Sequence, residues 1–373
     1  MSRHLHIVCL DAPCPPDYGG AIEMFGKIKA LYQEGIKIHL HYFDYKNRDV
    51  HELNSYCETI HSYKRKSFRQ GFSFSIPYIV SSRINDELVL NLNKDDHPVI
   101  LEGIHCTGIL NALDIETRKV LIRLHNDEAF YYDKLAKYES NLFKKIYFTA
   151  ESKLLIKYQT GLPKNCLYAC LSKKDAHSFT EKYALPKVEF LPAFTGWSQV
   201  NCKEGIGNFC LYHGNLSVAE NEKAACWLLD KVFTKIKVPL VIAGKHPSRR
   251  LSKWAHLCQH TCLVADPSEK EMNDLLEKAH IHILPSFNDT GVKLKLLHAL
   301  YRGRHCVVNP GAVEGSGLDA ACHIGKNANA IASIVLQLHH QPFGEEEIQL
   351  RKKILCETYN NQRNAQKVIA WLY

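Results

Sequence analysis

A strand–loop–helix–strand unit stands out in residues 282–309, which read HILPSFNDTGVKLKLLHALYRGRHCVVN. The apolar run 282–285 is short enough for a strand, the spacing of apolar residues over 293–301 predicts a helix, and the run 306–309 predicts the next strand. Alternating strands and helices of this kind are typical of parallel sheets that are covered on both faces.

The same alternation continues on both sides of this unit. The second half of the chain has further predicted helices over 221–234 and 269–278 and further predicted strands at 209–214, 239–244 and 261–264. The first half has a predicted helix over 21–34 and predicted strands at 5–10, 37–43, 99–101, 119–124 and 167–171. The sequence therefore predicts an α/β protein with two Rossmann-like domains, whose ligands would bind in a cleft at the carboxyl ends of the strands.

The length of the chain also favours two domains, because 373 residues exceed one ordinary hydrophobic core. The stretch 191–208 carries Pro192, Gly196, Gly205 and Gly207 without a clear period, as linkers do. We expect a first domain over 1–195, a second over 205–348, and a C-terminal helix within 349–373 that packs back on the first domain.

Composition narrows the class of protein. Lysine and arginine exceed aspartate and glutamate by 47 − 39 = 8, which suits ligands that carry phosphate, anionic lipids or nucleic acid. The chain begins with a strand pattern and has no apolar run near the roughly 18 residues that span a bilayer, so we expect a cytoplasmic protein.

The fourteen cysteines are expected to be reduced thiols, because several lie in apolar strand-like runs. Zinc ligation is an alternative for two pairs, Cys166 with Cys170 and Cys258 with Cys262. Neither pair has the usual two-residue gap, and nothing nearby completes a tetrahedral set, so thiols are favoured.

The loop and helix start at 286–295 have the features of a phosphate site. Gly291 allows close approach of a ligand, Thr290 can cap the helix, and the first N–H groups of the helix can bind a diphosphate. Lys293 or Lys295 adds a positive charge at the same end. The alternative is an ordinary surface helix with a capping threonine and solvated lysines.

Four segments of the second half resemble the donor domain of family 4 glycosyltransferases. Residues 288–295, which read Asn-Asp-Thr-Gly-Val-Lys-Leu-Lys, are similar to the donor-binding signature of that family in its Gly-Thr-Gly variant. Residues 211–217, 241–245 and 309–315 resemble the first strand and loop, the basic turn, and the Gly-Ala-Glu-Gly loop that closes the site. The resemblance implies the GT-B fold and a nucleotide-diphosphate sugar bound by Gly214, Asn215, Lys245, Thr290, Gly291, Val292, His298 and Glu314.

One departure from the family concerns its two glutamates eight positions apart, which correspond here to Thr290 and His298. The second glutamate is expected to hold the ribose hydroxyls of the donor. His298 could do so with a ring nitrogen, or it could be a plain helix residue, and the identity of the nucleotide stays open.

The first half offers two further segments at strand ends. Gly19 and Gly20, between Pro15-Pro16 and Ala21, resemble the diglycine opening of the family, which lies near the donor phosphates. The run 123–128 with the tyrosines that follow resembles the family's His-Asn-x-Glu-x-x-Tyr stretch. That resemblance implies that His125 approaches the donor sugar, and that the acceptor side includes Glu102, His105, Asn126, Glu128 and Tyr132. Without the resemblance, the run 123–128 would be interpreted as a turn with a capping residue. Glu151 is a weaker candidate for the site.

The segment 63–74 interleaves basic and aromatic residues. This pattern suits a membrane surface that carries a lipid-linked acceptor, although a solvated basic loop would look the same. We expect peripheral contact with the inner membrane face.

The resemblance to family 4 glycosyltransferases implies a retaining hexosyltransferase of polysaccharide or glycoconjugate synthesis, with His125, Lys293 and Lys295 as catalytic residues. No Asp-x-Asp triplet occurs in the sequence, so we expect no metal and no cofactor besides the donor. The alternatives are a catalytically impaired sugar-nucleotide-binding subunit and a sugar-nucleotide epimerase of similar shape. Nucleic acid is not an expected partner, because only the net charge points to it.

Overall fold

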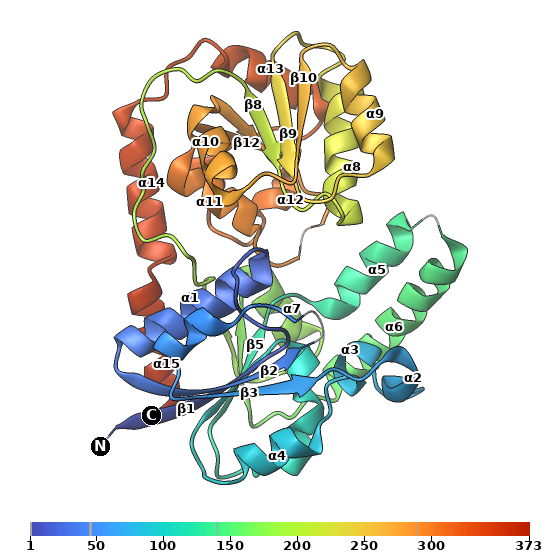
Figure 1. Ribbon diagram of the computed structural model, residues 1–373, viewed down its shortest axis with the longest axis vertical. Coiled ribbons are helices and arrows are strands. Elements are labelled where there is room, and N and C mark those ends of the chain that lie inside the picture. The colour runs from blue at the N-terminus through green and yellow to red at the C-terminus, as the bar shows by residue number, and fades with distance from the viewer. Residues whose placement is uncertain (1, 45–46, 140, 289) are drawn as a thin grey trace. The chain divides into compact units, whose positions relative to one another are not determined.

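The computed structural model describes residues 2–44, 47–139, 141–288 and 290–373, which form two compact units (Figure 1). The first unit comprises Met1–Gly196 together with Tyr359–Tyr373, and the second comprises Trp197–Thr358. Each unit has one parallel sheet with helices on its faces.

The first unit has a seven-stranded parallel sheet in the order β3-β2-β1-β4-β5-β6-β7. Its strands are β1 (Arg3–Cys9), β2 (Ile36–Asp44), β3 (Thr59–Lys64), β4 (Val99–Glu102), β5 (Val120–Leu124), β6 (Leu167–Cys170) and β7 (Val188–Phe190). Its main helices are α1 (Gly19–Gln33), α4 (Asp86–Leu92), α5 (Glu128–Tyr138), α6 (Leu142–Thr160), α7 (Lys173–Glu181) and α15 (Asn361–Leu372), with short helices α2 (Phe68–Gly71) and α3 (Tyr78–Ser81) and 3₁₀ segments η1 (His51–Ser55) and η2 (Ile104–Ala112). The strand order reverses between β1 and β4, and ligands of open α/β sheets bind at such a point.

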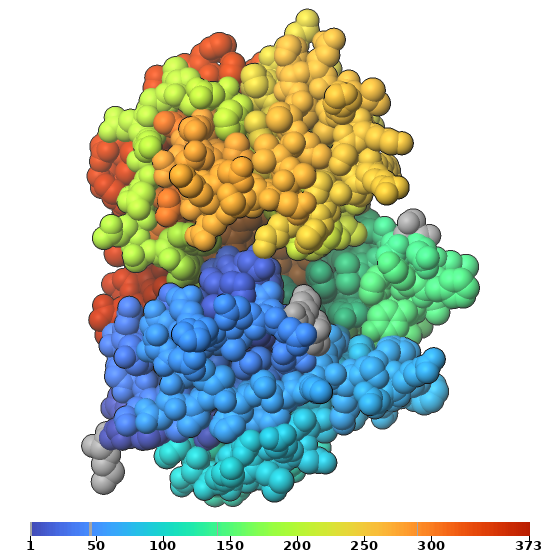
Figure 2. Space-filling model, viewed as in Figure 1, coloured from blue at the N-terminus to red at the C-terminus, as the bar shows by residue number. Residues whose placement is uncertain are grey.

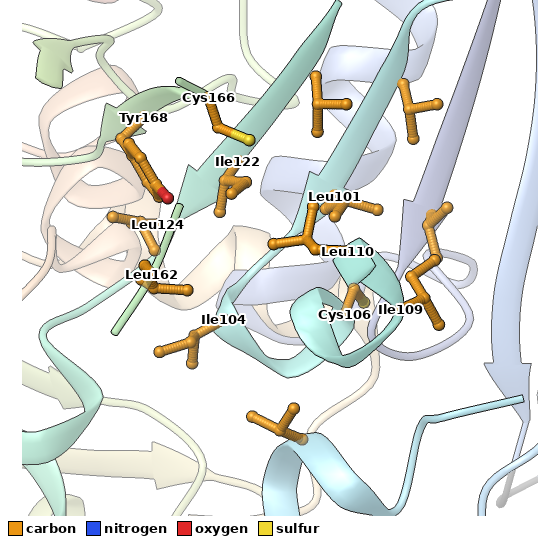
Figure 3. Close-up of a cluster of buried hydrophobic side chains, with 14 of the residues drawn as sticks. Leu101, Ile104, Cys106, Ile109, Leu110, Ile122, Leu124, Leu162, Cys166 and Tyr168 are labelled. Carbon is orange, nitrogen blue, oxygen red and sulfur yellow. The ribbon is translucent and has the colours of Figure 1, made fainter. Parts of the chain in front are cut away.

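The core of this unit lies on both faces of its sheet. Figure 3 shows part of one face, where Leu101 of β4 and Ile122 of β5 lie among side chains of η2 such as Leu110. On the other face, Ile7 of β1 packs in a cluster with Ile28 of α1. Burial on both faces explains why these strands read as continuous apolar runs.

The C-terminal region differs from the single helix expected within 349–373. It consists of α14 (Glu345–Thr358), which belongs to the second unit, and α15, which packs against α1 of the first. The side chain of Asn360 accepts a hydrogen bond from the Arg363 N–H at 2.9 Å and so caps α15. A capping residue favours a new helix start over a continuous helix.

The second unit has a six-stranded parallel sheet in the order β10-β9-β8-β11-β12-β13. Its strands are β8 (Cys210–His213), β9 (Leu240–Gly244), β10 (Thr261–Ala265), β11 (Ile281–Ile283), β12 (His305–Val308) and β13 (His323–Ile324). Its helices are α8 (Ala219–Trp227), a π-helical turn η3 (Leu228–Val232), α9 (Arg249–Leu257), α10 (Glu269–Lys278), α11 (Leu294–Arg302), α12 (Pro310–Val313), η4 (Asp319–Ala321), α13 (Ala328–Leu338) and α14. The order again reverses at the first strand, between β8 and β11.

The prediction of an α/β fold with two Rossmann-like sheets is confirmed. The strands β3, β7 and β13 were not predicted from the sequence. All three are edge strands, β7 has three residues and β13 has two, and the apolar residues of β3, Ile60 and Tyr63, are separated by two polar ones, so none of them forms an apolar run. All fourteen cysteines are unpaired thiols, and burial raises the pKa of Cys166 to about 11. Within the described ranges, every helix is too short or too polar to pass through a bilayer.

Candidate active site

The second unit brings four chain segments together at the carboxyl ends of β8, β9, β11 and β12, which are neighbours in the sheet. The loop after β8 is bonded to the loop after β9, because the Leu216 N–H donates to the Lys245 carbonyl at 2.9 Å. The loops after β11 and β12 are joined by Asn309, whose side chain bonds both the N–H and the carbonyl of Ser286 at 2.8 and 2.7 Å. These contacts give the site a defined framework before a ligand binds.

Gly244 is required by this framework. A Cβ atom at this position would lie 1.8 Å from the carbonyl oxygen of Gly214, well inside van der Waals contact. The two strand ends therefore approach each other more closely than any other residue would allow. The side chain of Asn215, at the same turn, accepts hydrogen bonds from the Ser217 N–H and hydroxyl at 3.1 and 2.7 Å.

Lys295 lies on the first turn of α11 and is partly buried. Its Nζ donates to Asn221 Oδ1 at 2.8 Å and lies 3.3 Å from the Tyr212 hydroxyl, so its hydrogen-bond partners are neutral. Burial lowers the pKa of Lys295 to about 8, against the effect of nearby Glu220. An anion would offset this cost of burial, which makes the position suited to a phosphate group.

The loop before α11 differs from the sequence prediction in one respect. Thr290 does not cap the helix: the N-cap is Lys293, without a side-chain cap hydrogen bond, and the Thr290 hydroxyl donates to Asn288 Oδ1 at 2.8 Å. Gly291 has a φ of 61°, which favours glycine, and Lys293 Nζ donates to the Thr290 carbonyl. The first N–H groups of α11 therefore keep the orientation that binds anions at a helix start.

His298 lies one turn further along α11 and stacks on Trp197, with ring centroids 4.3 Å apart and planes 14° apart. Its Nε2 is buried and has no hydrogen-bond partner in the described part of the chain. Burial lowers the pKa of His298 to about 4, so the ring is neutral at pH 7. Of the other predicted donor residues, Val292 is partly buried and Glu314 is exposed just after α12.

In the first unit, a buried network of charged groups lies at the carboxyl ends of β4 and β5. Nε2 of His125 is 2.8 Å from Oε2 of Glu102, and Lys27 of α1 donates to Glu102 as well. Lys27 also donates to Glu23 Oε2 at 3.0 Å, and Arg123 Nε donates to Glu23 Oε1 at 2.9 Å. The structure thus brings two predicted residues, His125 and Glu102, into direct contact, and the network adds three that were not predicted, Glu23, Lys27 and Arg123.

The charges of this network balance, with two carboxylates against one lysine and one arginine. Burial alone would raise the pKa of Glu23, but Lys27 and Arg123 outweigh it and hold the pKa at about 2. Glu23, Glu102 and His125 also point ligand atoms within 4.8 Å of one another. Because Lys27 and Arg123 already neutralise both carboxylates, the group is poorly suited to a metal cation. Glu23 and Lys27 are charged residues four apart on the buried side of α1, and this spacing could have indicated a buried ion pair from the sequence.

The other predicted residues of this unit differ in burial and in hydrogen bonding. Glu128 is buried, accepts a hydrogen bond from Asn126 Nδ2 at 3.2 Å, and has its pKa raised to about 7 by burial. Tyr132 packs against the apolar core, and burial raises its pKa well above the usual value. His105 is partly buried and its Nδ1 has no partner within the described segments. Glu151 accepts from the Tyr78 N–H at 2.9 Å and so has a structural role.

Gly19 and Gly20 are the first two residues of α1, after the N-cap Tyr18, which makes no side-chain cap hydrogen bond. The Tyr18 hydroxyl instead donates to Asp11 Oδ2 at 3.0 Å. As at any helix start, the first N–H groups have no acceptor within the helix.

Comparison with known proteins finds similarity to glycosyltransferases and to one protein of a cps region. Residues 207–341 match the family model described as glycosyl transferases group 1. A 44.6 kDa protein in the cps region of Klebsiella pneumoniae is 26% identical over 349 residues, which cover 83% of this chain and 84% of that protein.

Solved structures share the fold over the whole chain. TarM has a TM-score of 0.70 at 11% identity, with 100% of this chain and 99% of that chain covered. Alr3699/HepE of Anabaena, in complex with UDP and glucose, has a TM-score of 0.64 at 10% identity, with 98% of each chain covered. The UDP-forming α,α-trehalose-phosphate synthase of Burkholderia xenovorans, in complex with glucose-6-phosphate, has a TM-score of 0.63 at 11% identity, with 99% of each chain covered. At these identities the likeness shows the fold.

Proposed function

Because this chain is a glycosyltransferase of the group 1 type with the GT-B fold, we propose that it transfers a hexosyl group from a nucleotide-diphosphate sugar with retention at the anomeric carbon. The acceptor would be a hydroxyl of a glycan or of a lipid-linked sugar, in polysaccharide or glycoconjugate synthesis. The relative in a cps region supports this setting, and the complex of Alr3699/HepE with UDP and glucose supports the class of donor.

The observation that carries the proposal is the partly buried Lys295 at the start of α11, whose hydrogen-bond partners are neutral. When the bond from the anomeric carbon to the diphosphate oxygen breaks, its electron pair stays on the diphosphate. Lys295, Lys293 and the first N–H groups of α11 would stabilise that charge, since preorganised donors act strongly where charge develops. Lys245, in the same unit, would bind the same diphosphate.

The network of the first unit supports a role for His125 at the sugar. If Nε2 donates to the Glu102 carboxylate, Nδ1 is left as an acceptor, so that the ring has one tautomer and one orientation. His125 would then accept a hydrogen bond from a sugar hydroxyl. Glu128, with a pKa of about 7, would accept one from the attacking acceptor hydroxyl.

The surface around α2 and the start of α6 supports peripheral membrane contact. An apolar patch of Phe68, Phe72, Phe74, Leu142, Phe143 and Ile146 is exposed there, with Phe74 and Phe143 at 88% and 84%. Phe68 and Tyr147 join the two elements with ring centroids 6.1 Å apart, and Figure 2 shows the light-blue and green surfaces next to each other. Exposed basic residues surround the patch, namely Lys64, Lys66, Arg69, Lys144 and Lys145. Tyr63 is not part of this surface, because it is buried in the core.

An apolar patch with a basic rim fits an anionic membrane. We expect the protein to float with anionic lipid vesicles and not with neutral ones, and Phe143→Asp to weaken flotation. Leu257→Asp is the matched control, because Leu257 is 80% exposed on α9 of the other unit. Absence of flotation with anionic vesicles would remove the membrane from the proposal.

The transfer reaction is tested by incubating the protein with a panel of sugar nucleotides and glycan acceptors. Proton NMR of the product gives the anomeric configuration, which should match that of the donor. An inverted product would contradict retention, and turnover without an acceptor product would favour hydrolysis alone.

A nucleotide-sugar-binding subunit without transferase activity is the second candidate. It is favoured by Thr290 and His298 in place of the two glutamates, and by Glu102, whose carboxylate is already bonded to Lys27 and His125. Binding of a sugar nucleotide without product for any acceptor would support it.

A further inference from the structure

In the first unit, one face of the sheet carries histidine side chains at the amino ends of β1 and β2, at positions where apolar side chains would be expected. Towards the carboxyl ends of β1 and β2, this face carries the fully buried Val8 and Phe43. Every second residue of a strand points to the same face, so towards the amino ends this face carries His4 and His6 on β1 and His39 and His41 on β2. Because faces of a parallel sheet are normally apolar, these histidines require an explanation.

Two of these imidazoles, those of His4 and His39, lie close to a third, that of His97 in the turn before β4. His4, His39 and His97 each have a ring nitrogen within 4.8 Å of the others, and Nδ1 of His4 is 3.0 Å from Nε2 of His39. A tetrahedral Zn²⁺ at 2.0–2.1 Å from each nitrogen needs ligand atoms about 3.3 Å apart. Small side-chain rotations would bring the three nitrogens to that geometry, and all three residues are only partly buried, so an ion can reach them.

The far nitrogens of His4 and His39 have partners that orient the rings for metal binding. Nδ1 of His39 is 3.0 Å from the Thr59 hydroxyl, and Nε2 of His4 is 3.0 Å from the Ser2 hydroxyl. If each far nitrogen donates its proton to the hydroxyl oxygen, both lone pairs point at the shared space. Histidine ligands of metals in proteins usually have such a partner on the second nitrogen.

The turn that carries His97 is held in place by Asp95. Oδ1 of Asp95 accepts hydrogen bonds from the His97 backbone N–H at 3.0 Å, from His6 Nε2 at 3.0 Å and from Arg118 at 3.3 Å. His97 stacks on His4 with ring centroids 4.9 Å apart. The third ligand is therefore positioned by the fold and does not depend on a flexible side chain alone.

We propose that His4, His39 and His97 bind one divalent transition-metal ion such as Zn²⁺, with water as the fourth ligand. Imidazole suits zinc, cobalt, nickel and copper, whereas magnesium and calcium require oxygen ligands. The site lies at the amino ends of the strands, and His125 follows the carboxyl end of β5. The ion would join β1, β2 and the turn before β4, and its role would be to stabilise the first unit.

The test is a titration of the full chain, free of any histidine tag, with Co²⁺ and with Zn²⁺. We expect one ion per chain by calorimetry, visible absorption of the Co²⁺ form without a thiolate charge-transfer band, and a higher melting temperature with Zn²⁺. His97→Ala should weaken binding by more than about tenfold, and Thr59→Val by about tenfold, since it removes only the partner of His39.

The matched control is His61→Ala, which removes an imidazole from the same face on β3 outside the three ligands and should change the affinity by less than about twofold. Full affinity in a folded His97→Ala variant, a thiolate band, or no binding to the wild type would overturn the proposal. Loss of binding in His125→Asn instead would locate the ion at the other cluster and would also overturn it.

Discussion

Lys295 and Lys293 lie at the same helix start, but their ammonium groups have different hydrogen-bond partners. Lys295 is held by Asn221 and Tyr212, whereas Lys293 reaches back to the carbonyl of Thr290 in its own loop. Both lie at the first turn of α11, so a diphosphate bound there would contact each of them.

We expect Lys295→Ala and Lys293→Ala each to lower kcat for donor turnover by about 30- to 1,000-fold, because each removes a charge-assisted contact with the leaving group. The control is Lys278→Ala, an exposed lysine on α10 paired with Asp274, which should leave turnover unchanged. Steady-state kinetics with the best donor of the panel measures the effect. Full activity in both α11 variants would show that the diphosphate binds elsewhere.

His282 makes the stability of the second unit depend on pH. Its ring is fully buried against Gly303, and neither ring nitrogen has a partner within hydrogen-bond distance among the described residues. Burial lowers its pKa to about 3, although the nearby Leu276 backbone acts in the opposite direction. The unfolded chain therefore binds a proton at pH values where the folded chain does not. Stability should fall as the pH drops from 6.5 towards 3, by at most about 1.4 kcal/mol per pH unit from this group.

His282→Leu should flatten that dependence, since leucine cannot be protonated. Urea unfolding at several pH values, followed by the fluorescence of Trp197, Trp227 and Trp254 in the second unit, measures the slope. His256→Leu, at an exposed position of α9, is the control and should keep the wild-type slope. An unchanged slope in His282→Leu would refute this explanation.

At the scale of elements, the break between α14 and α15 decides which unit the end of the chain joins. Asn360 caps α15, and Asn361 bonds the backbone of Thr195 in both directions, at 3.0 and 2.7 Å. Ala365, Val368 and Leu372 then pack in the core beneath α1. The helix is thus held by a cap at its start and by apolar contacts along its length.

We expect Asn360→Ala to lower the free energy of unfolding of the first unit by about 1 kcal/mol, because it removes the acceptor for the Arg363 N–H. Asn360→Asp keeps a capping oxygen and should retain most of the stability. Chemical unfolding followed by circular dichroism compares the variants. Equal losses in both would mean that the asparagine acts in some way other than as a cap.

At the scale of the whole molecule, the two units contribute different chemistry. The second unit offers helix-start N–H groups and lysines, which suit a diphosphate. The first offers a charge-balanced network around His125 and a carboxyl group with a pKa near 7. We therefore expect nucleoside diphosphates to bind mainly through the second unit.

A thermal-shift screen checks this division. A nucleoside diphosphate at 100 times its dissociation constant should stabilise the protein by about 2.7 kcal/mol through mass action. Lys295→Ala should reduce the shift strongly, whereas His125→Asn should leave it nearly unchanged. The opposite pattern would assign the diphosphate to the first unit.

Much of the fold and part of the site could be predicted from local sequence patterns. Helix α10 was predicted at its observed bounds, and the predicted strands at 99–101 and 261–264 end within one residue of β4 and β10. Apolar periodicity and glycine positions depend on neighbours along the chain, so they are visible without a structure. The same holds for the placement of His125, Glu102 and Lys295 at strand ends and a helix start.

The contacts among side chains required the tertiary structure. Lys27 meets Glu102 across 75 positions, Glu23 meets Arg123 across 100, and His298 stacks on Trp197 from another part of the chain. The sequence by itself determined the α/β architecture and the strand ends where chemistry would lie. Only the order of the strands decided which charges balance and which imidazoles converge, because parallel pairing brings together residues that are far apart in sequence.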